Sequence, residues 1–99
     1  MQSQEQIDQT KKICSTDLEF KVLTSFINCL YAEPGFSDVC VNEISYETKL
    51  SKPVVKGVVG SLCKKGILFV DDDNYFKGIL YLNNKYWYLH PEWKNETPF

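Results

Sequence analysis

The fold is decided by residues 41–70, VNEISYETKLSKPVVKGVVGSLCKKGILFV. Asn42 is predicted to cap a short helix here, because an asparagine side chain accepts the free N–H groups of a first turn. Ser51 is predicted to cap a second helix, and Pro53 suits the first turn of that helix, where a missing N–H costs nothing. Gly66 is predicted to end the second helix in a left-handed conformation, and a short apolar strand follows it.

The second helix, predicted over residues 52–65, has two unlike sides. Its inner side is predicted to carry apolar residues at helical spacing, namely Val55, Val58, Val59 and Leu62. Its outward side carries small or basic residues, namely Pro53, Lys56, Gly57, Gly60 and Lys64. Interior glycines cost about 1 kcal/mol each relative to alanine. Packing against the rest of the domain therefore has to hold this helix.

This order of elements resembles the winged helix-turn-helix superfamily, of the MarR-like bacterial or phage regulator type. The resemblance is carried by residues 41–44, 50–52 and 64–68, together with Val55, Val59 and Leu62. It implies an α+β fold in which three helices pack on a small antiparallel β-sheet that forms the wing. It also implies a DNA-binding regulator of transcription whose helix 52–65 enters the major groove. The DNA-binding residues would be Ser51, Lys52, Pro53, Lys56, Gly57, Gly60 and Lys64.

The outward side of this helix differs from that of DNA-reading members, which usually carry Arg, Gln, Asn or Ser there. Gly57 and Gly60 stand where side chains would reach base edges. Lysines at the remaining positions hold phosphates, which position a protein without specifying sequence. The formal net charge of −2 also lacks the basic balance of most nucleic-acid binders. An alternative function is therefore a winged-helix module that binds another protein and not DNA.

An earlier helix is predicted from Thr16, whose capping box with Glu19 starts it, to about residue 32. Its apolar arc is wider than a one-sided helix needs. The arc contains Leu18, Val22, Leu23, Phe26, Ile27, Cys29 and Leu30, and Phe20 and Tyr31 extend it. Either the C-terminal aromatic residues or a second copy of the chain would cover the extra flank. We favour the second copy, and thus a homodimer through residues 16–32.

Strands are predicted at residues 36–40, 78–82 and 86–89, the last two joined in a hairpin at residues 83–85. Residues 71–74 are predicted to form an acidic turn. One face of the aromatic C-terminal segment is expected to pack in the core. The other face is a candidate interface, because Trp and Tyr dominate binding hot spots. The candidate partner-binding residues are Phe20, Tyr31, Trp87 and Trp93.

The remaining expectations concern the ends, the chemistry and the compartment. Residues 1–14 are predicted to be a flexible tail or a turn or two of helix, residues 15–91 the domain, and residues 92–99 a second tail. The four cysteines fit no zinc pattern and are predicted to be reduced thiols of a cytoplasmic protein. His90 is predicted to be a surface residue. No catalytic motif, cofactor site, metal site or membrane segment is predicted.

Overall fold

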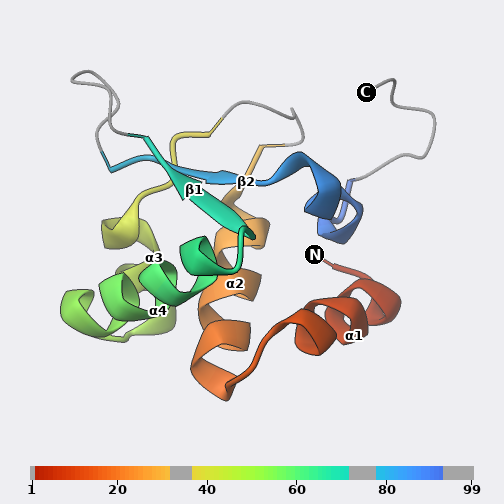
Figure 1. Cartoon of the computed structure of the whole chain (residues 1–99), viewed down its shortest axis with the longest axis horizontal. Coiled ribbons are helices and arrows are strands. Elements are labelled where there is room, and N and C mark those ends of the chain that lie inside the picture. Colours follow the sequence, from red (N-terminus) through yellow and green to blue (C-terminus); the bar gives the residue numbers. More distant parts are fainter. Residues whose placement is uncertain (1, 32–36, 72–77, 93–99) are drawn as a thin grey trace.

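The structure is a computed structural model that describes residues 2–31, 37–71 and 78–92. Within these ranges, four α-helices, α1 to α4, precede a two-stranded antiparallel sheet and a 3-10 helix, η1. Figure 1 shows the sheet on one side of the helical layer, with α1 and α3 on either side of α2. The predicted α+β class is confirmed, and this layout is compatible with a winged helix. Among the residues that the structure describes, no helix is both long and apolar enough to cross a membrane.

Helix α2, Asp17–Cys29, begins where its capping box predicts. The Thr16 hydroxyl accepts the Glu19 N–H at 3.1 Å. The Glu19 carboxylate accepts the Ser15 N–H at 2.8 Å, one residue before the expected partner. The inner face of α2, including Phe26, is fully buried in the core.

Helices α3, Val41–Thr48, and α4, Lys52–Lys64, form the helix-turn-helix pair. The expected cap at Asn42 is wrong, because the cap position of α3 is Cys40, two residues earlier, and Cys40 makes no side-chain cap bond. The turn between the helices depends on Lys49, whose φ of 62° is left-handed. The predicted cap at Ser51 is confirmed, since its hydroxyl accepts the Val54 N–H at 3.4 Å.

The sheet pairs β1, Leu68–Val70, with β2, Leu80–Leu82. Gly66 precedes β1 with a φ of 75°, as the glycine stop predicts. The hairpin expected at residues 83–85 is wrong, because β2 pairs with β1 and not with residues 86–89. The connection between β1 and β2 spans residues 71–79. Of the acidic turn predicted within that connection, residues 72–74 lie outside the described part of the chain.

Residues 86–89 form part of η1, Asn84–Leu89, and not the expected strand. Asn83 caps η1, since its side chain accepts the Lys85 N–H at 3.3 Å. The strand expected at residues 36–40 is also absent from its described part, residues 37–40. One backbone bond, from the Leu80 N–H to the Val39 carbonyl at 2.9 Å, joins that segment to β2.

Within residues 1–14, which were predicted to be a flexible tail or a turn or two of helix, the structure has the ten-residue helix α1, Gln4–Ile13. Two glutamines dock α1 on η1. The Gln2 amide donates to the Leu89 carbonyl at 2.9 Å, and the Gln6 amide donates to the His90 carbonyl at 2.6 Å. These bonds satisfy carbonyls at the end of a helix, which need partners outside it.

Candidate functional site

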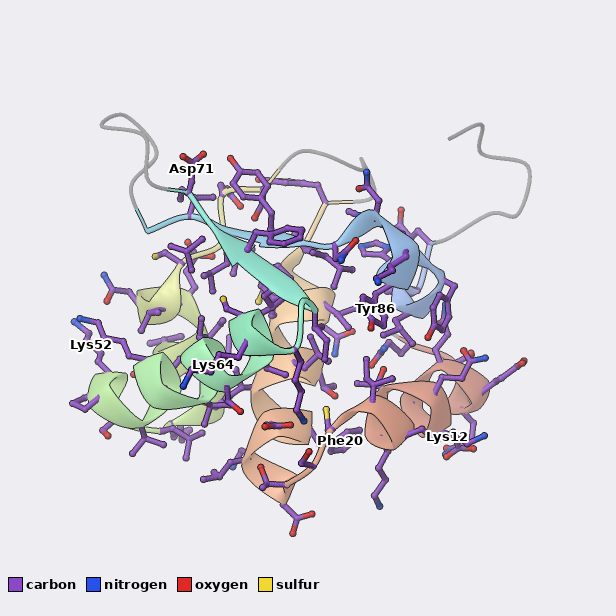
Figure 2. All side chains as sticks on the ribbon, viewed as in Figure 1. Lys12, Phe20, Lys52, Lys64, Asp71 and Tyr86 are labelled. Carbon is purple, nitrogen blue, oxygen red and sulfur yellow. The ribbon has the colours of Figure 1, made fainter. Side chains whose placement is uncertain are left out.

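The outward side of α4 is the best-formed candidate surface. We call Lys52, Lys56, Gly57, Gly60 and Lys64 the lysine ridge, and all five residues are exposed. Apart from the chain neighbours and the backbone of α4 itself, no heavy atom of the described residues lies within 4 Å of a Cβ built on either glycine. Figure 2 shows Lys52 and Lys64 on this side of α4, away from the core. Another molecule can therefore approach the α4 backbone closely at the glycines.

The inner side of α4 explains why the ridge faces outward. Val55, Val59 and Leu62 are buried, as the helical spacing predicts, and Val58 packs against the core from its edge. The remaining predicted residues, Ser51 and Pro53, are exposed at the start of the helix. The structure thus brings all the predicted DNA-binding residues to one helix and its cap.

The ridge lysines make no ion pair with any residue that the structure describes. Helix α4 contains no acidic residue. In the described ranges the only ion pair joins Lys65 to Glu19, so Lys52, Lys56 and Lys64 have no ionic partner there. Three cations on one face raise the local concentration of an anionic ligand, although the whole chain is weakly acidic.

An apolar cleft of about 340 Å³ lies beside the ridge, between α4, the start of α3 and the β1–β2 hairpin. Val59, Val70 and Leu80 line its walls, and Lys56 and Gly60 of the ridge also line it. Val70 is 43% exposed. The cleft has room for an apolar side chain of a ligand that lies along α4.

The C-terminal end of α4 is fixed to the start of α2 by a buried carboxylate. Glu19 accepts bonds from Lys65 Nζ at 2.6 Å and from the Ser61 hydroxyl at 2.7 Å, besides the Ser15 N–H. Burial raises the pKa of this carboxyl, but these bonds outweigh burial and lower the pKa from 4.5 to about 2. Glu19 therefore stays ionised and sets the position of the ridge relative to α2.

The predicted partner-binding residues are not brought together. Trp87 is 3% exposed, so its assignment to an interface is wrong; the short turns of η1 point it into the core. Trp93 lies outside the described residues. Tyr31 is 53% exposed and donates to Asp38 at 3.3 Å. Phe20 is half-buried where α1 meets α2 (Figure 2). The Lys11 Nζ lies 5.8 Å from the centroid of its ring.

His90 is buried and not a surface residue as predicted. Its Nδ1 accepts the Glu92 N–H at 3.1 Å, so the proton is on Nε2, which lies 3.1 Å from the Leu30 carbonyl and donates to it. Both ring nitrogens are thus occupied by backbone groups, and the imidazole serves to hold the chain end on α2.

All four cysteines are free thiols. Burial raises the pKa of the Cys14 thiol to about 11, with a smaller contribution from Glu19. Burial also raises the pKa values of Cys29 and Cys63. Because the thiolate is the reactive form, these three side chains stay protonated near neutral pH and act as small apolar residues.

Sequence reasoning missed Glu19, Ser61 and Lys65 as the residues that orient the ridge, and it missed the cleft beside it. The capping box indicates Glu19 only as part of the start of a helix and not as a contact to α4. Comparison of the chain with models of protein families, with curated proteins and with solved structures found no match.

Proposed function

We propose that this protein binds double-stranded DNA through the lysine ridge, as a small regulator of transcription in the cytoplasm. The observation that carries the proposal is the row of exposed lysines on α4, which has neither an acidic residue nor a described ionic partner. Lys52, Lys56 and Lys64 would contact phosphates on the two sides of a groove. The glycines between them would let the helix backbone approach the duplex.

This form of binding has little sequence preference. Phosphate contacts fix register and orientation, and base edges are read by side chains that the ridge does not carry. Specificity would then come from the shape and deformability of the duplex. We expect affinities for unrelated duplexes to be similar at equal length.

The test is fluorescence anisotropy with a short labelled duplex of random sequence over a range of salt. Release of counterions from three phosphate contacts gives a slope of about −2.7 in a plot of log K against log salt. Each of Lys52→Gln, Lys56→Gln and Lys64→Gln should make that slope shallower by about 1. Lys12→Gln is the matched control, because Lys12 is exposed on α1, away from α4 (Figure 2). Binding that is equally weakened by the control, or no binding at low salt, would remove the proposal.

A second candidate function, docking of an acidic protein segment, is favoured by the apolar cleft. A duplex has few apolar groups to fill it, whereas a helix with one large apolar side chain and flanking carboxylates would fit the cleft and the lysines together. Gly60→Arg separates the two functions, because Gly60 belongs to both the ridge and the cleft wall. The added guanidinium should strengthen duplex binding. The same side chain should block a peptide of leucine and glutamate from reaching Val59 and Val70. The methyl NMR signals of these two valines report whether the peptide binds.

A further inference from the structure

The apolar cleft beside the lysine ridge has a buried floor and an open mouth. Val59 and Leu80 are core residues and form the floor. Val70 also lines the cleft, and its side chain is partly exposed to solvent there. Lys56 and Gly60 line the cleft from the exposed side of α4 and mark its mouth. The cleft therefore presents apolar surface that a small ligand can remove from water.

The walls of the cleft offer one positive charge in an otherwise apolar lining. Lys56 is the only charged residue among the described residues that line it. Its ammonium group makes no ion pair within the part of the chain that the structure describes. The thiol of Cys63, also in the lining, acts as a small apolar group. A matching ligand has an apolar chain for the walls and a single anionic group for the Lys56 ammonium.

We propose that this cleft binds a free medium-chain carboxylate, such as octanoate or decanoate. The hydrocarbon chain lies against Val59, Val70 and Leu80. The carboxylate lies at the mouth and accepts a charge-assisted hydrogen bond from Lys56 Nζ. The cleft volume of about 340 Å³ is close to the lower limit of small-ligand pockets, about 300 Å³, so a chain of medium length suits it better than a long one.

This ligand site overlaps the surface proposed to bind DNA, but binding of the carboxylate does not depend on that proposal. Lys56 and Gly60 belong both to the cleft and to the lysine ridge. A carboxylate on Lys56 competes with a phosphate for the same ammonium group, so bound octanoate should weaken duplex binding. This one consequence rests on the proposed function. The experiments that follow are made without DNA.

Isothermal titration calorimetry with monomeric ligands tests the chain and the head group separately. From hexanoate to decanoate, each added methylene should tighten binding by about fourfold, because each one leaves water for an apolar wall. Octanoate should bind about two- to fivefold more tightly than octanol, since only the carboxylate pairs with an exposed lysine. Lys56→Gln should remove this preference for the carboxylate and should leave the binding of octanol unchanged.

Two glycines of α4 test where the ligand binds. Gly60 lines the cleft and Gly57 does not, and a Cβ built on either one meets open space. Gly60→Leu puts a side chain into the cleft, so it should weaken octanoate binding by about tenfold or more. Gly57→Leu makes the same change on the same helix outside the cleft and should leave octanoate binding unchanged. Octanoate should shift the methyl NMR signals of Val59 and Val70 in the wild type.

Several results would overturn the inference. No binding of any carboxylate in the series would show that the cleft takes no such ligand, even if the peptide of leucine and glutamate binds there. Equal octanoate binding by the two leucine variants would place the ligand elsewhere. Equal affinity of the wild type for octanoate and octanol would remove the role of Lys56. Far-UV circular dichroism of each variant separates loss of binding from loss of folding. A wild type that binds octanoate as expected but binds no duplex would support this inference and remove the proposed function alone.

Discussion

Replacing Glu19 by glutamine tests the buried carboxylate that fixes α4 to α2. Glutamine keeps the size and one acceptor oxygen, so the change removes the charge and little else. The pKa of Glu19 is lowered from 4.5 to about 2. Through proton linkage, this lowering corresponds to a contribution of at most about 3 kcal/mol to the free energy of unfolding near neutral pH. Because the Lys65 side chain is 32% exposed and solvent screens its charge, we expect a loss of about 1 to 3 kcal/mol.

Urea denaturation followed by circular dichroism measures this loss, with Glu5→Gln as the control. Glu5 is exposed in the first turn of α1, and its replacement should cost less than about 0.5 kcal/mol. The pH dependence gives an independent check. A carboxyl with a lowered pKa in the folded state contributes fully above its unfolded pKa, 4.5, and loses that contribution as the pH falls through its folded pKa, about 2. The difference between wild type and Glu19→Gln should therefore shrink across that window. Equal stability near neutral pH, or a difference that persists below about pH 2, would refute the reasoning.

Two further predictions concern α4 and the core. Gly57→Ala and Gly60→Ala should each raise the free energy of unfolding by up to about 1 kcal/mol, because both glycines are helical and have open space around them. Gly66→Ala should lower the free energy of unfolding by about 1 kcal/mol, since the φ of 75° strains any residue with a Cβ. Thermal or urea melts in which all three variants change stability in the same direction would contradict these expectations. Trp87→Ala should cost about 3 to 5 kcal/mol, measured by the same denaturation, because the side chain is buried. A loss below about 1 kcal/mol would indicate a surface residue.

The sequence predicts the helical part of the fold well, because its signals are local. Thr16 and Ser51 accept backbone N–H groups within the next turn, and Gly66 supplies a left-handed residue directly after α4. The inner valines of α4 follow from helical spacing alone. The residues predicted for the outward side of α4 lie there for the same reason, since residues that share one face of a helix do so whatever surrounds the helix.

The C-terminal part was predicted incorrectly because its local signals fit two structures. Aromatic residues favour strands, yet any half-buried position accepts them. Asn83 is a turn residue in either case, and here its side chain caps η1 while its amide donates to the Gly66 carbonyl at 2.7 Å. The docking of Gln2 and Gln6 on η1 joins opposite ends of the chain, so no local pattern in the polar N-terminus indicates it.

The two concave surfaces also lie beyond local patterns. The cleft beside the ridge joins Val41, Val59, Val70 and Leu80 from four separate elements, and a groove of about 720 Å³ along the outward face of α2 joins residues of α1, α2 and α3. The exposed fraction of Trp87 depends on the path of η1 and could not be read from composition. Positions set by packing between distant segments need the structure.

The most direct test of DNA binding by the lysine ridge compares duplex binding by the wild type with binding by a variant that carries Lys52→Gln, Lys56→Gln and Lys64→Gln together. All three lysines are exposed, so the variant should fold as the wild type does. We expect the wild type to bind a random duplex at low salt and the triple variant to lose nearly all of this binding. Equal binding by the two proteins would contradict DNA binding through the lysine ridge.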